Sequence, residues 1–193
     1  MGGGYNYNMK EIKVDSLEIY DLLNSAKGFK KGFYNMIKIL SPDGETFSCI
    51  GSIALFSIEL FLKTLCAISN YNENNGFGKY LKDHNLSKLY IYLKNDDSKY
   101  VTDLENQFEK SKYHTNNSLE TELSYFKIGF EEWRYSFNYQ GDLSLNLNVI
   151  SCLLNNLEQY ASEKIKLIQI KENNKKTRRF VYSNFEDICG EIF

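Results

Sequence analysis

A carboxylate and an amine stand four residues apart in the most apolar stretch of the chain, IALFSIELFLKTL, as Glu59 and Lys63. Glutamate followed by lysine at this spacing puts the two charges side by side on a helix. A carboxylate in apolar surroundings must be paired or partly desolvated. Glu59 is therefore either half of a buried structural ion pair or a ligand-binding residue, and Lys63 is its partner in both cases.

A second group of polar side chains lies around the segment FEEWRYSFNY (130–139). At helical spacing, Glu131, Arg134 and Asn138 form a polar line beside an apolar stripe. Arg134 with Glu131 would be an ordinary surface ion pair. Alternatively, Arg134 and Asn138 contact a ligand, because a guanidinium can hold a phosphate with two parallel hydrogen bonds.

The chain has two histidines, His84 and His114, in separate predicted loops and without the carboxylates or thiols that would complete a metal site. His84 belongs to the segment DHNL, where it either satisfies backbone groups at a helix start or exchanges protons with a substrate. The sequence has no G-x-S-x-G nucleophile elbow and no phosphate-binding P-loop. We therefore expect neither a metal nor a cofactor.

A basic tract lies near the C-terminal end of the sequence, just before an aromatic and acidic end. Its cations are Lys171, Lys175, Lys176, Arg178 and Arg179. Such a tract either contacts phosphates or is a solvated linker. The formal net charge is −2 with a pI of about 5.8, so any binding of nucleic acid must come from a local patch of this kind.

Apolar spacing predicts helices that would position these side chains. The long ones are expected at about 15–40, 45–69, 117–140 and 142–172, with two shorter ones within 82–94 and 98–110. The segment NYNENNGFGK (70–79) is rich in asparagine and glycine and predicts a loop. No alternating pattern of strand length recurs, which favours an all-α fold.

The first of these helices has a long apolar stripe that predicts its core face. Its members recur at three- and four-residue spacing and are Ile19, Leu22, Ala26, Phe29, Phe33, Ile37 and Leu40. With 193 residues and 42% hydrophobic content, one domain with one core is expected. We predict an up-down bundle of four to five main helices over 15–172, preceded by a flexible segment (1–14) and followed by a basic and aromatic tail (173–193).

Three short patterns, taken in order, resemble the HEPN superfamily of helical nucleotide- and RNA-associated domains over about residues 20–165. They are S-x-E-x-x-x-K (Ser57, Glu59, Lys63), D-H-N-L (83–86) and W-R-Y (133–135). That family is similar in having an E-x-x-x-K helix, an H-x-L start to a shorter helix and an R-Y ending. The resemblance implies a HEPN-like bundle, a homodimer, and a role in a bacterial defence or toxin–antitoxin system.

In the ribonuclease members of that family, the arginine opens an R-x(4–6)-H motif whose histidine does the acid–base work. Arg134 matches the arginine, but Tyr139, Gln140 and Gly141 occupy the histidine positions. Tyrosine is a poor substitute, because its reference pKa is near 10 whereas that of histidine is near neutrality. The resemblance therefore implies a module that binds RNA, a nucleotide or a protein partner without an intact ribonuclease motif.

Two alternatives remain at the level of sequence. The chain is an endoribonuclease in which Arg134 works with His84 or Tyr139, or it is a helical interaction scaffold without a ligand site. The start MGGGYNYN has neither the basic nor the apolar region of a signal peptide, and the longest uncharged apolar run is too short to span a bilayer. We expect a cytoplasmic location and no membrane partner.

Overall fold

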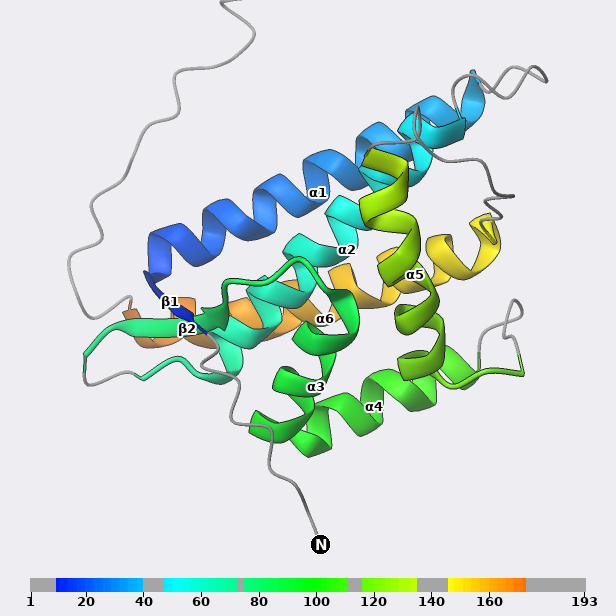
Figure 1. Ribbon diagram of the computed structural model, residues 1–193. Helices are drawn as coiled ribbons and strands as arrows, with labels where there is room; N and C mark the ends of the chain where they lie inside the picture. Colours follow the sequence, from blue (N-terminus) through cyan, green and yellow to red (C-terminus); the bar gives the residue numbers. More distant parts are fainter. Residues whose placement is uncertain (1–9, 40–46, 73–74, 111–115, 135–145, 173–193) are drawn as a thin grey trace, which may run out of the picture.

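The computed structural model describes residues 10–39, 47–72, 75–110, 116–134 and 146–172. These residues form six helices and two short strands (Figure 1). The helices are α1 (Ser16–Lys38), α2 (Phe47–Ser69), α3 (Leu86–Asp96), α4 (Ser98–Glu109), α5 (Leu119–Arg134) and α6 (Leu147–Glu172). The strands are β1 (Glu11–Asp15) and β2 (Phe77–Leu81). The predicted mainly helical fold is confirmed.

Helix α2 is the centre of the molecule and packs against α1, α3, α5 and α6 (Figure 1). Its sequence is apolar nearly all round, so it can bury side chains on every face. It meets α1 along its length, and the Ser57 hydroxyl donates a hydrogen bond to the carbonyl of Ala26 on α1 at 2.8 Å. The polar residue Ser57 is thereby satisfied inside the core, with a structural role.

Helix α1 begins at the capping pattern that its sequence indicates. The backbone N–H of Glu18 donates to the Asp15 side chain at 2.9 Å, and the N–H of Asp15 donates to the Glu18 carboxylate at 2.8 Å. These two reciprocal bonds satisfy donors that the first turn of a helix leaves open. The cap also fixes the end of β1, because Asp15 is the last residue of that strand.

Two short strands accompany the predicted helices. They pair antiparallel, with Lys13 opposite Lys79, and lie at the end of the molecule where α1 begins (Figure 1). Residues 77–79 were predicted as loop, and residues 11–14 as part of a flexible segment; both belong to strands. The reason is tertiary: Val14 and Leu81 are buried, and only a paired strand can cover that end of the core.

Two glycines let β2 approach α2 closely. Gly76 has a φ of 73°, in the left-handed region that glycine adopts without strain, and turns the chain into the strand. At Gly78, a Cβ atom would lie 2.1 Å from the carbonyl oxygen of Ala67 on α2, closer than any side chain allows. The glycines in this asparagine-rich segment therefore seat a strand against a helix.

Candidate functional site

The charged pair Glu59–Lys63 is buried in the middle of α2. The Lys63 Nζ donates to Glu59 Oε1 at 2.6 Å, across one turn of the helix. The Glu59 side chain is 1% exposed. The sequence predicts that Glu59 is paired, and the structure shows both charges inside the protein and joined to each other.

His84, in the loop before α3, contacts the Glu59 carboxylate and is the third member of this group. Its Nδ1 lies 3.0 Å from Glu59 Oε1 and 3.2 Å from Oε2, while its side chain is 58% exposed. A buried carboxylate beside one ring nitrogen fixes the orientation of an imidazole and sets which nitrogen carries the proton. We call Glu59, Lys63 and His84 the Glu59 cluster.

The loop that carries His84 is held by its own hydrogen bonds. Asp83 accepts from the N–H of Asn85 at 2.9 Å and from Lys88 Nζ at 2.9 Å. Asn85 in turn accepts from the N–H of Lys88 at 3.2 Å and caps α3. The cap role considered for His84 therefore belongs to Asn85, and the histidine ring turns to Glu59 instead.

Tyr80 on β2 adjoins the Glu59 cluster. The Lys63 Nζ lies 5.6 Å from the centre of its ring, within the range of a cation–π contact. Burial, with the added negative charges of Glu18 and Glu59, raises the pKa of the Tyr80 hydroxyl. Tyr80 therefore remains a neutral hydroxyl at physiological pH. No predicted element includes Tyr80, because the sequence does not reveal the strand that carries it.

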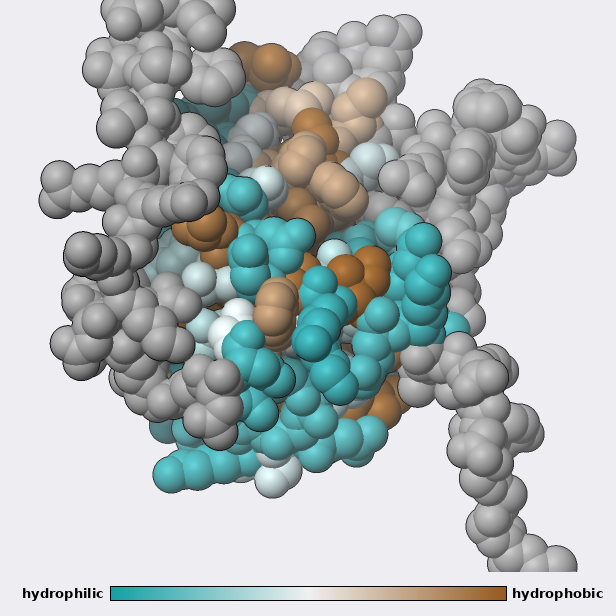
Figure 2. All heavy atoms as spheres, turned by 90° about the vertical axis from the view of Figure 1, so that its left-hand side faces the viewer, coloured by the Kyte–Doolittle hydropathy of each residue, from teal (hydrophilic) through white to brown (hydrophobic). Residues whose placement is uncertain are grey.

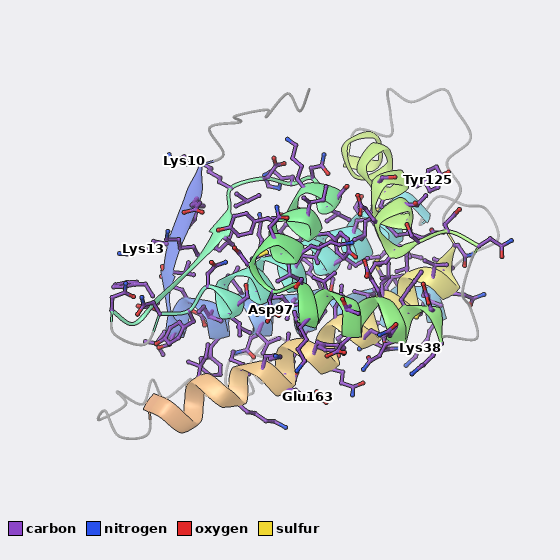
Figure 3. The ribbon with its side chains drawn as sticks, turned by 90° about the horizontal axis from the view of Figure 1, so that it is seen from below. Lys10, Lys13, Lys38, Asp97, Tyr125 and Glu163 are labelled. Carbon is purple, nitrogen blue, oxygen red and sulfur yellow. The ribbon has the colours of Figure 1, made fainter. Side chains whose placement is uncertain are left out.

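Strand pairing places two pairs of lysines on the two-stranded sheet, one pair on each face, because side chains alternate along paired strands. Lys13 and Lys79 are direct cross-strand partners, and the N–H of Lys82 donates to the carbonyl of Lys10 at 2.8 Å, which extends the same register. Like charges directly opposite each other destabilise a strand pair. An ion pair between Lys79 Nζ and Glu11 Oε2 at 3.1 Å reduces this repulsion. We call Lys10, Lys13, Lys79 and Lys82 the lysine ribbon; Figure 3 labels two of them, Lys10 and Lys13, along β1.

An aromatic side chain accompanies these lysines. Phe77 is more than one third exposed, and the Lys13 Nζ lies 4.6 Å from its ring centre. Phe77, Lys13 and Lys79 share one sheet face, because side chains alternate along paired strands. Exposed aromatics among cations are a common combination on surfaces that bind single-stranded nucleic acids. The alternating segment EIKVD (11–15) was the sequence signal that could have revealed this surface.

The structure brings together only part of the predicted site. Glu59, Lys63 and His84 are in contact, although His84 was grouped in sequence with Arg134 and Tyr139. Arg134 is the last residue of α5, whose C-terminal end lies away from the sheet (Figures 1 and 3), and its side chain is outside the described residues. The pairing of Arg134 with His84 therefore stays a prediction.

Other predicted site residues also fall outside the described part of the chain. They are Asn138, Tyr139, Lys175, Lys176, Arg178 and Arg179. Among the described residues, no group of three or more histidine, cysteine, aspartate or glutamate side chains is arranged to hold a metal ion. The chemistry available in the described site is thus that of a carboxylate, an amine, an imidazole and a phenol.

Comparison with known proteins adds no relative. No family model, no curated protein and no solved structure matches the chain. One helix of the described residues, Cys49–Ser69, is long and apolar enough to cross a membrane, but 78% of its most apolar stretch is buried inside the protein. This burial is what the core helix of a soluble domain requires.

Proposed function

We propose that the protein is a HEPN-like helical module that binds RNA without cleaving it. In this proposal it is a cytoplasmic homodimer and serves a bacterial defence or toxin–antitoxin system, as the resemblance in sequence implies. Two of the three segments that carry the resemblance are those of Glu59–Lys63 and His84, which contact each other. This contact supports the proposal, because two patterns that are separate in the sequence meet at one place in the fold.

The observation that carries RNA binding is the presence of exposed lysines on the sheet, with Lys13 and Lys79 paired beside Phe77. The His84 imidazole contacts the buried Glu59 carboxylate, and His84 follows the exposed Lys82 by two residues on the chain. Lysine and a protonated histidine can each neutralise a phosphate. Phe77 is partly exposed next to Lys13 and adds an aromatic side chain of the kind on which bases stack. A short single-stranded segment of RNA would meet cations and an aromatic side chain on the face of the sheet that carries Lys13, Lys79 and Phe77.

The absence of a histidine at 139–141 supports binding without cleavage. The removal of a general base or acid typically costs about 100- to 10,000-fold in rate. Phosphate binding by Arg134 or by the tract Lys175–Arg179 needs no proton transfer. Binding and cleavage are therefore expected to be separate properties of this chain.

One observation favours a second candidate function, a metal-independent endoribonuclease. A carboxylate that orients an imidazole is the arrangement of a general base, and Glu59 holds His84 in this way. In such an enzyme, His84 Nε2 would take the proton of the attacking 2′-hydroxyl, and Arg134 would stabilise the charge on the phosphate. The roles depend on Arg134 reaching His84, within one chain or across a dimer.

RNA binding can be measured by fluorescence anisotropy with a labelled single-stranded RNA of mixed sequence. We expect Lys13→Ala to weaken binding and to reduce the slope of log K against log salt by about 0.7, the value for one lost phosphate contact. Lys99→Ala, an exposed lysine on α4, is the matched control and should change neither quantity. Equal losses in both variants would refute a site on the lysine ribbon.

The homodimer is proposed through the aromatic segment WRYSFNY (133–139). The sequence of this segment holds more aromatic side chains than one core stripe can use. Light scattering at micromolar concentration should report twice the chain mass of 22.5 kDa. A single species of 22.5 kDa would rule out the dimer.

A further inference from the structure

A groove runs between α1, α2 and β2. Its apolar floor is formed by Leu22, Phe29, Phe56 and Leu60. Phe29 and Phe56 meet edge to face with ring centres 4.7 Å apart, yet Phe29 is 37% exposed. The cavity measures about 360 Å³, which is large enough for several side chains of a docked segment.

The rim of this groove is negatively charged. Glu18 and Asp21 stand along it on α1, and both are exposed. The charge of Glu18 also contributes to the raised pKa of Tyr80, which closes the groove on the β2 side. An apolar floor with acidic edges is complementary to a chain segment that carries aromatic side chains together with cations.

Figure 2 views the molecule from the end that carries the sheet. Apolar side chains gather in the upper half of this face, above a mainly hydrophilic lower part. Exposed apolar surface of this kind marks a binding site more often than a free surface. The groove is accordingly a candidate docking surface.

The chain itself contains a segment of the required chemistry. Residues 175–182 read KKTRRFVY, with four cations next to Phe180, Val181 and Tyr182. Helix α6 ends at Glu172, at the same end of the molecule as the start of α1 (Figures 1 and 3). An extended chain covers up to about 3.3 Å per residue, so the ten residues 173–182 can span about 33 Å. The segment is thus close enough to reach the groove.

We propose that residues 175–182 dock in this groove of the same chain, with Phe180 and Tyr182 on the apolar floor and the lysines and arginines against Glu18 and Asp21. The docked segment covers Leu22 and Phe29 and lies beside Tyr80. If the proposed function is correct, the same cations also contact RNA phosphates. Docking and RNA contact by the tail then exclude each other, and RNA releases the tail from the groove.

The proposal can be tested by hydrogen–deuterium exchange and mass spectrometry on the full chain, without RNA. Amides of 176–182 should exchange at least about 10-fold more slowly than in the isolated peptide KKTRRFVY, and this protection should be independent of protein concentration. Asp21→Lys should remove most of it. Asp103→Lys, an exposed carboxylate changed on α4, is the matched control and should leave it unchanged.

Reversing the charges on both sides tests the contact between Asp21 and the tail specifically. Combining Asp21→Lys with Arg178→Glu and Arg179→Glu should restore most of the protection, because the attraction is re-established with opposite signs. Circular dichroism of each variant shows that the helices remain. A tail that exchanges as fast as the free peptide, or protection that does not depend on Asp21, would overturn the proposal. Protection that rises with protein concentration would assign the groove to the tail of a second copy and would also overturn it.

Because no RNA is present, a failure here leaves the RNA-binding proposal untouched. Conversely, a protein that fails to bind RNA can still show the protected tail. The two proposals are therefore separately testable.

Discussion

Two ion pairs occupy contrasting environments in this molecule. Lys63 and Glu59 pair within α2, and the Glu59 side chain is 1% exposed. Lys30 and Glu158 join α1 to α6, and the Glu158 side chain is 32% exposed. Water can still solvate Glu158, whereas Glu59 depends entirely on protein partners, among which is His84. The comparison indicates that Glu59 carries a considerable cost of desolvation, which only its protein partners can offset.

The largest expected effect is that of removing the buried carboxylate. Glu59→Ala should lower the free energy of unfolding by more than about 1.5 kcal/mol, because it leaves Lys63 in an apolar environment without its partner. Urea denaturation measures this change. Glu158→Ala should cost less than about 1 kcal/mol, since a partly exposed pair contributes little. Equal losses in the two variants would break the comparison.

Replacing both buried charges sharpens the distinction between stability and function. The double variant Glu59→Leu with Lys63→Leu should be at least about 1 kcal/mol more stable than Glu59→Ala, because no unpaired charge remains inside α2. Its RNA affinity should nevertheless fall, since His84 loses the carboxylate that orients it. Urea denaturation and anisotropy together test this. Recovered stability with unchanged RNA affinity would assign the pair a purely structural role.

His84 should affect stability far less than Glu59. More than half of its side chain is exposed, so His84→Ala should change the free energy of unfolding by no more than about 0.5 kcal/mol. Thermal melting at neutral pH provides the measurement. If His84→Ala instead destabilises the protein as much as Glu59→Ala, the histidine is a structural clamp on the loop.

The smallest expected effect is a change in how the free energy of unfolding depends on pH in acid, caused by Asp83. Burial alone would raise the pKa of Asp83, but hydrogen bonds from the Asn85 N–H and from Lys88 outweigh it and hold the pKa below its ordinary value of 3.8. A folded pKa below the unfolded one contributes stability at neutral pH that is lost as the pH falls through and below about 4. Asp83→Asn should therefore flatten the stability curve below pH 5. If the free energy of unfolding of the variant falls with decreasing pH below 5 just as that of the wild type does, Asp83 does not hold the loop.

The helices could be predicted from sequence because each has an apolar stripe at helical spacing. The stripe of α1 is mostly confirmed as a core face. Ile19, Ala26 and Phe33 are buried, Leu22 and Ile37 are partly buried against the core, and Leu40 lies outside the described residues. Phe29 is the exception, because it is exposed in the groove that Leu22 also lines. Periodicity indicates which face of a helix is apolar, but it does not indicate whether a neighbouring element covers that face. The groove therefore had no signal in the sequence.

The candidate site was partly predictable for a similar reason. A carboxylate within IALFSIELFLKTL had to be paired, and Lys63 one turn away was the evident partner. The contact with His84 joins residues 25 positions apart and depends on how β2 seats against α2. That seating requires the close approach at Gly78, which a loop prediction for this segment concealed. Tertiary packing, rather than local propensity, decided this part of the structure.

The most direct test of the central claim measures RNA binding and RNA cleavage on the same samples at neutral pH, with and without divalent metal. Wild-type protein, His84→Ala and Arg134→Ala are compared. The account predicts salt-sensitive binding by the wild-type protein, weaker binding by His84→Ala, and no cleavage by any of them. Metal-independent cleavage by the wild type that both substitutions abolish would contradict it and establish the endoribonuclease instead.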